Sequence, residues 1–254
     1  MPERLSFTGA GLFNSTIIKV YMRVCRCYKL IMKPRRFVIP DIHGCALTFR
    51  CLLEDVIRIE QSDSIYLLGD TIDRGPRSRE VLDTIRRLKA SGYGVQSVRG
   101  NHEEMLLKSC RDRSFFYLWM QNGGHETLKS FGVEDGCEIP RLYRRLIESF
   151  PFFIKLEEFI LVHGSLNFTI PDPLTDREAM LWSRNPHVIK GLIGGRKLVG
   201  GHTPMSWKEI NRSLTTDHIM LDNGCVYKGE RGMGRLTALE LNSMTLHFHK
   251  NIDF

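Results

Sequence analysis

The stretch that decides the fold is "SIYLLGDTIDRGPRS", residues 64–78. Its first part, residues 64–68, is a short apolar run that predicts a buried strand. The strand leads into a loop that holds Asp70, Asp73 and Arg74 between two glycines. Charge concentrated directly after a buried strand is typical of a site built at the edge of a sheet, because the sheet holds such side chains rigidly.

The same arrangement recurs at four more predicted strand ends. The segments are PDIHG (40–44), RGNHE (99–103), LVHG (161–164) and GGHTP (200–204). Together the five loops carry polar side chains of the kinds that bind metal ions or transfer protons: Asp41, His43, Asp70, Asp73, Asn101, His102, His163 and His202. Because the carboxyl ends of neighbouring strands meet at one edge, we expect these side chains to converge.

Each of these residues alone has a structural explanation, since aspartates cap helices and turns, and Gly-Asn is common in turns. Five such loops in order favour a shared site. Its ligands are nitrogen and oxygen atoms without a thiolate, which favours a hydrolytic Mn, Fe or Zn centre. The ligands outnumber the needs of one ion. A carboxylate shared by two ions about 3.5–4 Å apart is the arrangement that clamps both oxygens of a phosphoryl displacement.

The remaining sequence predicts one mixed α/β domain over residues 34–254, with no linker that divides it. Helices are expected near 49–57, 81–88 and 178–182, and a helical insertion over 102–149. Residues 152–164 predict a hairpin. Five late segments are strand-like and are expected to pair as antiparallel neighbours: KLVGGH (197–202), EINRSL (209–214), HIML (218–221), RLTALEL (235–241) and MTLHFH (244–249).

Residues 1–33 predict a basic tail, disordered or a start-site extension, with Met22 or Met32 as the alternative starts. Residues 1–36 hold eight Lys or Arg against one acid, whereas the rest of the chain carries 28 basic and 28 acidic residues. Nucleic acid or membrane contact is therefore expected only of the tail, if at all. The chain has no apolar run of the ~20 residues that a membrane span requires. Seven scattered cysteines indicate reduced thiols and a cytoplasmic protein.

The ordered set PDIHG, GDTIDRG, RGNHE, LVHG and GGHTP resembles the signature motifs of the phosphoprotein phosphatase (PPP) family of metallophosphoesterases, in particular its bacterial and phage protein phosphatases. The resemblance covers residues 35–240. It implies a two-sheet β-sandwich flanked by helices, with a dinuclear metal site at the strand ends. It also implies hydrolysis of a phosphorylated protein or small phosphate ester, with protein serine/threonine phosphatase activity expected, and two divalent ions, Mn²⁺ first and Fe or Zn as alternatives.

The resemblance also implies a role for each motif residue. Asp41, His43 and Asp70 would hold one metal, and Asp70 would bridge to a second ion held by Asn101, His163 and His202. A hydroxide bridging the metals would attack phosphorus in line, without a phosphoenzyme. His102 would protonate the leaving oxygen and Asp73 would orient its imidazole. Substrate phosphate would be bound by Arg74, Asn101 and, from the short match MLWSR, Arg184.

Three other functions remain open at this point. A symmetrical diadenosine tetraphosphate hydrolase is the nearest alternative, but those enzymes resemble GD-x-x-ARG and lack an acid at the position of Asp73. A non-catalytic scaffold with the same fold would be expected to have lost ligands, and none is missing. Nucleic-acid binding through the basic tail predicts an affinity that falls with salt and is lost when the tail is removed.

Overall fold

The computed structural model describes residues 34–254, and the prediction of a basic tail at 1–33 lies outside them. The strands are β1 (Arg36–Ile39), β2 (Ser64–Leu67), β3 (Gly94–Ser97), β4 (Phe153–Lys155), β5 (Phe159–Val162), β6 (Lys197–Gly200), β7 (His218–Met220), β8 (Arg235–Glu240) and β9 (Thr245–Lys250). The α-helices are α2 (Ala46–Cys51), α3 (Ser78–Ala90), α4 (Asn101–Ser109), α5 (Arg113–Gln121), α6 (Gly124–Phe131), α7 (Arg141–Glu148), α8 (Arg177–Trp182) and α9 (Trp207–Ser213). Short turns of other helix types are η1 (Leu52–Val56), η2 (Gly136–Glu138), η3 (Pro173–Thr175) and η4 (Lys190–Ile193).

The strands form two sheets. The first has the order β3-β2-β1-β8-β9, in which β1, β2 and β3 are parallel and β8 is antiparallel to both β1 and β9. The second has the order β4-β5-β6-β7, with an antiparallel β4–β5 hairpin followed by parallel pairs. Parallel neighbours need long crossovers, and here helices supply them. The carboxyl ends of five parallel strands therefore present the motif loops.

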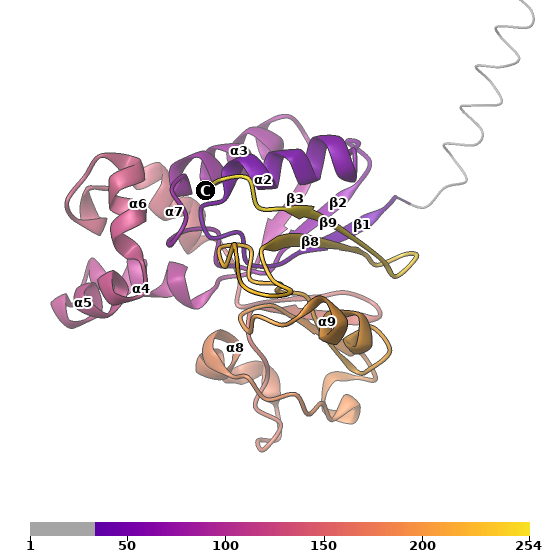
Figure 1. Cartoon of the computed structure of the whole chain (residues 1–254). Coiled ribbons are helices and arrows are strands. Elements are labelled where there is room, and N and C mark those ends of the chain that lie inside the picture. Colours follow the sequence, from indigo (N-terminus) through magenta and orange to yellow (C-terminus); the bar gives the residue numbers. More distant parts are fainter. Residues whose placement is uncertain (1–33) are drawn as a thin grey trace, which may run out of the picture. The chain divides into compact units, whose positions relative to one another are not determined.

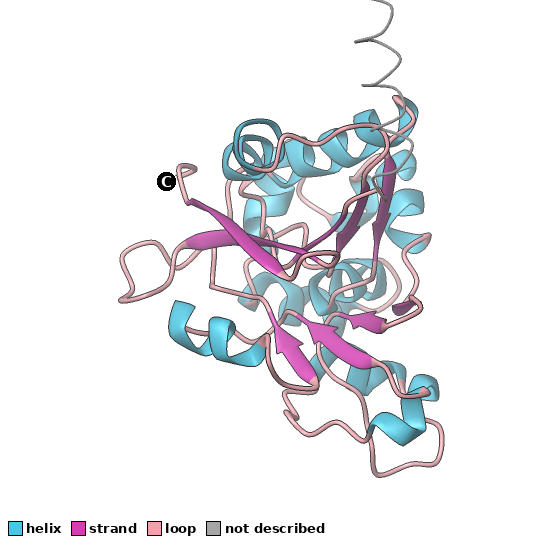
Figure 2. Cartoon of the chain, turned by 90° about the vertical axis from the view of Figure 1, so that its right-hand side faces the viewer, coloured by secondary structure: helices cyan, strands magenta, loops and turns pink. Residues whose placement is uncertain are grey.

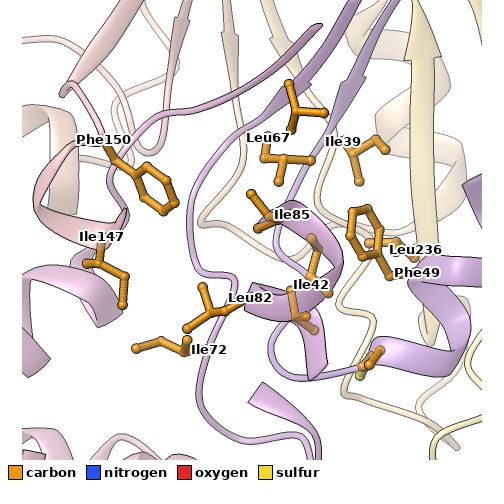
Figure 3. Close-up of a cluster of buried hydrophobic side chains, with 14 of the residues drawn as sticks. Ile39, Ile42, Phe49, Leu67, Ile72, Leu82, Ile85, Ile147, Phe150 and Leu236 are labelled. Atoms are coloured by element: carbon orange, nitrogen blue, oxygen red, sulfur yellow. The ribbon is translucent and has the colours of Figure 1, made fainter. Parts of the chain in front are cut away.

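Three clusters of buried apolar side chains hold these elements together. Figure 2 shows the two sheets facing each other with helices outside. Val38 of β1 packs with Leu161 and Val199 of the second sheet in the cluster between the sheets. The other face of the first sheet is covered by α2 and α3, where Ile39 and Phe49 belong to the cluster drawn in Figure 3. This alternation of faces follows from the period of two along each strand.

The helical insertion predicted over 102–149 is present as α4, α5, α6, η2 and α7. Figure 1 shows these helices grouped at one side of the two sheets, next to α3. Trp119 of α5 is fully buried in the same cluster as the core of the first sheet. The insertion is thus an integral part of the domain.

Two predictions about the late segments are wrong. Residues 209–214 do not form a strand, because they lie largely in α9, where Ser206 accepts from the Glu209 amide and Glu209 Oε2 accepts from the Ser206 amide. This capping box starts a helix. The pairing is also wrong in part, since β6 and β7 are parallel to their neighbours and only β8 and β9 pair as expected.

The two-sheet α/β architecture flanked by helices is confirmed. The expected helix over 49–57 is present, although it continues from α2 as the π-helix η1. None of the helices within residues 34–254 is both long and apolar enough to cross a membrane.

Candidate metal centre

The eight polar residues predicted from the strand ends come together in one buried cluster. Asp41 and His43 follow β1, Asp70 and Asp73 follow β2, and His163 follows β5. None of the eight is more than 9% exposed, although all carry polar side chains: Asp41, His43, Asp70, Asp73, Asn101, His102, His163 and His202. Buried polar groups are costly unless they are bonded or paired, so this cluster requires compensation.

Asp70 stands at the centre of the cluster. Its Oδ2 lies 3.6 Å from His43 Nε2 and 3.4 Å from His163 Nε2. Two triads of metal-capable atoms share this carboxylate: one with His43 and His102, the other with His163 and His202. The position of Asp70 in both triads is the geometry that a bridging carboxylate requires.

Carbonyl oxygens fix the tautomers of two histidines. His43 Nδ1 donates to the Ile72 carbonyl at 3.0 Å, and His163 Nδ1 donates to the Leu68 carbonyl at 2.8 Å. A carbonyl can only accept, so each Nε2 presents a lone pair to the centre. This outer support is what metal-binding histidines have in proteins.

The second triad brings acceptor atoms unusually close together. His163 Nε2 lies 2.8 Å from Asn101 Oδ1 and 3.1 Å from His202 Nδ1. Since His163 Nε2 presents a lone pair, its contact with the Asn101 oxygen has no proton between the two atoms. A cation satisfies such a pair, and the imidazole, amide and carboxylate donors suit a divalent transition metal. The residues present therefore fit a metal site.

Burial shifts the pKa values of several groups in the cluster. Burial raises the pKa of the Asp70 carboxyl well above its usual value, and Asp41 and Glu103 raise it further. Burial also lowers the pKa of His43 and of His163 well below the ordinary histidine value. Each of these groups resists charge in this environment. A bound cation compensates a buried carboxylate and requires a neutral imidazole.

Asp73 and Arg74 both contact His102 of the first triad. Asp73 Oδ2 lies 2.7 Å from His102 Nδ1, and Arg74 Nη2 lies 3.0 Å from His102 Nε2. Arg74 Nη1 lies 2.9 Å from His43 Nε2. Arginine can only donate, so His102 Nε2 accepts and His102 Nδ1 donates to the carboxylate. The His102 ring thus has one nitrogen bonded to an acid and the other facing the centre.

The motif loops hold an uncommon backbone. Among the described residues, seven non-glycine residues have a positive φ, and five of them lie here: His43, Asp70, Asp73, Arg74 and His202. Such conformations cost of order 1–3 kcal/mol each and persist where surrounding contacts determine them. A Cβ at Gly100 would lie 2.1 Å from Asp70 Oδ1, and one at Gly201 would lie 2.2 Å from Asp41 Oδ1. Glycine at these two positions lets the backbone approach the carboxylates.

Glu103 supports the central loop, and the sequence analysis gave it no role. Its Oε2 accepts from the Asp70 and Gly100 amides at 2.9 Å each, and its Oε1 accepts from the Thr71 amide at 2.7 Å. Glu103 is fully buried. It is the third residue of α4, where a glutamate commonly reaches back to the amide at the helix start. That position was the signal that could have identified it.

Two residues of the helical insertion bind Asp73, and the sequence analysis missed both. Trp119 Nε1 donates to Asp73 Oδ2 at 2.8 Å, and Thr127 Oγ1 donates to Asp73 Oδ1 at 2.6 Å. Asp222, also missed, is 3% exposed; burial raises the pKa of Asp41 well above its usual value, and the charge of Asp222 raises it further. These contacts join distant parts of the chain, so no local pattern signals them.

Arg184 is the predicted residue that lies apart from the buried cluster. It is exposed, and no hydrogen bond or ion pair joins its side chain to the described residues. Its charge nevertheless reaches the centre, because the pKa of His202 is lowered to about 4 first by burial and then by Arg184. Trp182, two residues earlier, is 40% exposed and packs edge-on against His202 with the ring centres 6.1 Å apart.

Two groups of named relatives match this chain over different lengths. The serine/threonine-protein phosphatase 1 of Salmonella typhimurium (strain LT2) is 28% identical over 209 residues, 79% of this chain and 91% of the relative. The symmetrical bis(5'-nucleosyl)-tetraphosphatase of Paracidovorax citrulli is 41% identical, but over 71 residues, 28% of this chain and 24% of the relative.

Solved structures share the fold at lower identity. A protein serine/threonine phosphatase from Saccharomyces cerevisiae superposes with a TM-score of 0.61 at 14% identity, covering 86% of this chain and 80% of that one. A putative diadenosine tetraphosphatase gives 0.59 at 22% identity, covering 88% and 96%. The family model of calcineurin-like phosphoesterases matches residues 34–238, which include all the motif loops. The chain therefore belongs to the calcineurin-like phosphoesterases and is a hydrolase.

Proposed function

We propose that the chain is a metal-dependent phosphomonoester hydrolase that acts on phosphorylated serine or threonine in proteins. The observation that carries the proposal is the 2.7 Å contact between Asp73 Oδ2 and His102 Nδ1 beside the shared carboxylate of Asp70. It supplies a proton donor for a poor leaving group, which is what the hydroxyl of serine or threonine is. Such an acid contributes typically 10²–10⁴-fold in rate.

His102 moves a proton at Nε2. With Nδ1 bonded to Asp73, a proton added to the ring resides on Nε2, where it replaces the hydrogen bond from Arg74 as that side chain turns to the substrate phosphate. The buried Asp73 carboxylate stabilises the resulting imidazolium, and Trp119 and Thr127 hold that carboxylate in place. The proton is then available to the leaving oxygen as the phosphorus–oxygen bond breaks.

Six residues would hold two divalent ions in this proposal: Asp41, His43, Asp70, Asn101, His163 and His202. The ions, when bound, would supply Lewis-acid activation of water and of the phosphoryl oxygens. The protein contributes a rigid frame, since Asp41 accepts from the His202 amide at 3.0 Å and Asp70 accepts from the His102 amide at 3.1 Å. Mn²⁺ is the ion proposed first, with Fe or Zn as alternatives.

Two arginines would bind substrate phosphate, with Asn101 nearby. Arg74 is partly exposed, and its planar guanidinium already lies at the centre, where it contacts His43 and His102. A guanidinium binds two phosphoryl oxygens at once, which an ammonium does not. Arg184 lies outside the buried cluster, free to meet a phosphate as it enters.

A hydrolysis assay on the purified chain with added Mn²⁺ tests this function. The specificity constants for a phosphoserine peptide and for diadenosine tetraphosphate are compared side by side. We expect the peptide to be preferred, and omission of metal or addition of a chelator to abolish turnover. A preference for the dinucleotide would overturn the proposed substrate while keeping the metals and the acid.

Symmetrical dinucleoside tetraphosphate hydrolysis is the second candidate. It is favoured by the 41% identity over 71 residues to a symmetrical bis(5'-nucleosyl)-tetraphosphatase. Asp73 argues against this candidate. Those enzymes resemble GD-x-x-ARG at this motif, with alanine instead of aspartate before the arginine. The longer match, over 91% of a protein phosphatase, also supports the first proposal.

A further inference from the structure

Four arginines, three of them exposed, line a cavity at the far end of α4 from the metal centre. The cavity has a volume of about 310 Å³, at the lower end of the range for small-molecule sites. Its lining includes residues of α7, the end of α4 and the link to α5: Cys110, Arg111, Arg141, Arg144, Arg145 and Glu148. Glu148 is the one acid among the lining residues, so the cavity carries an excess of positive charge.

Some arginines of the domain form ion pairs with acids. Arg77 lies 3.2 Å from Asp253 and Arg99 lies 2.9 Å from Glu104. In contrast, Arg111, Arg141 and Arg145 form no ion pair with any residue of 34–254. Like charges held close on a helix are destabilising, and a bound anion relieves the repulsion.

The local structure places two of these arginines on one helix face and fixes the side chain of a third. Arg141 and Arg145 lie four residues apart on α7 and therefore share one face. Arg144 Nε donates to the Ile139 carbonyl at 2.9 Å, which fixes that side chain while leaving its terminal nitrogens for another partner. Planar guanidinium forks bind the oxygens of a tetrahedral phosphate in pairs.

We propose that this cavity, the α7 pocket, binds a phosphate group as a dianion at a second site separate from the metal centre. Asn101 and His102 begin α4, and Cys110 follows its last residue, so the pocket lies about one helix length, roughly 13 Å, from the first turn. The same chemistry has two sources. One is free orthophosphate; the other, which rests on the proposed function, is a second phosphoryl group on the substrate protein.

Cys110 reports on occupancy of the α7 pocket. Cys110 lines the cavity and is partly exposed, so we expect a bound phosphate to shield its thiol from a neutral alkylating reagent such as iodoacetamide. Alkylation rates are measured peptide by peptide by mass spectrometry on the full chain, with and without orthophosphate. Cys51 of α2, also partly exposed, is the control thiol in the same sample.

We expect 10 mM orthophosphate to slow alkylation of Cys110 about fivefold and to leave Cys51 unchanged, because four guanidinium groups hold the anion in place. Sodium chloride at equal ionic strength should have no such effect. Arg141→Gln with Arg145→Gln should abolish the protection. Arg87→Gln with Arg212→Gln, which removes the same charge from two other exposed helical positions, should retain it. Equal protection by chloride, or protection that survives Arg141→Gln with Arg145→Gln, would overturn the proposal.

Phosphopeptides distinguish the two sources. If the substrate supplies the group, a doubly phosphorylated peptide protects Cys110 at concentrations where orthophosphate does not, and Arg141→Gln with Arg145→Gln raises its KM while kcat for a singly phosphorylated peptide is unchanged. If orthophosphate is the ligand, it protects at the lower concentration. Because alkylation of Cys110 does not depend on turnover, a chain that fails to hydrolyse phosphopeptides still gives a decisive result for the pocket.

Discussion

Trp119 Nε1 donates to Asp73 Oδ2 at 2.8 Å, and that oxygen also lies 2.7 Å from His102 Nδ1. The indole thus shares one carboxylate oxygen with the imidazole proposed as the acid. Thr127 Oγ1 binds the other oxygen at 2.6 Å. Both partners come from the helical insertion, so α5 and α6 fix the rotation of a carboxylate that belongs to a loop of the first sheet.

We expect Trp119→Phe to lower kcat on a phosphoserine peptide about tenfold. The change removes one hydrogen bond to a charged group, worth about 1.5–3 kcal/mol, and frees the carboxylate to turn. The rate with p-nitrophenyl phosphate should fall much less, because its leaving group departs without a proton.

Trp207→Phe on α9 is the control for loss of an indole, and metal content is measured for both variants. An equal loss on both substrates after Trp119→Phe would indicate general damage to the site and contradict the positioning role.

Asp70→Asn and His102→Asn separate ligand from acid. Asp70 belongs to both triads, so its loss should remove both metal ions and nearly all turnover. His102→Asn should retain about two ions per chain while kcat falls about 10²–10⁴-fold. Elemental analysis of the purified variants gives the metal content directly. If His102→Asn also loses its metal, His102 is a ligand, in keeping with its place in the first triad.

Arg74→Lys tests recognition of the phosphoryl group. The ammonium keeps the charge but loses the fork that reaches His43 and His102 together. We expect kcat/KM to fall roughly 10- to 100-fold, as for the loss of one or two charge-assisted bonds. Arg184→Lys is the matched change at the exposed position, where a smaller loss is expected. Equal losses at both positions would contradict the central role of Arg74.

The site residues that the sequence revealed are those whose side chains follow strands. Asp41, Asp70 and His163 could be predicted because the end of a buried strand is visible as the end of an apolar run, and parallel strands end at one edge. The position of a residue directly after an apolar run therefore predicted which side chains come together. The parallel pairing of β6 and β7 could not be read in this way, since strand direction depends on the path of the connecting helix.

The partners of Asp73 depend on tertiary structure alone. Trp119 and Thr127 are 46 and 54 residues away from Asp73 in the chain. A Trp in an apolar helix is expected in the hydrophobic core, so its sequence context does not indicate a contact with Asp73. The α9 error differs, because the sequence Ser206-Trp-Lys-Glu209 contains a visible capping-box pattern that outweighs the alternating polarity of residues 209–214.

A buried histidine away from the metal centre makes stability depend on pH. His218 of β7 is 5% exposed, and neither ring nitrogen has a hydrogen-bond partner in the described residues. Burial lowers its pKa from the usual 6.5 to about 4, and the nearby carbonyls of Pro186 and Asn185 only partly offset this effect. The folded protein therefore holds this imidazole neutral under conditions in which the unfolded chain binds a proton.

The stability supplied by the neutral ring is complete above about pH 6.5 and is lost as the pH falls toward about 4, because the unfolded state then binds more protons than the folded state. The total is about 3 kcal/mol, of which about 2 kcal/mol falls between pH 7 and pH 5. Urea unfolding at pH 7, 6 and 5 in a chelator measures it, with metal occupancy held constant. His218→Leu has no such proton, so its free energy of unfolding should decline less steeply by that amount. Parallel curves for the two proteins would show that His218 titrates alike in both states.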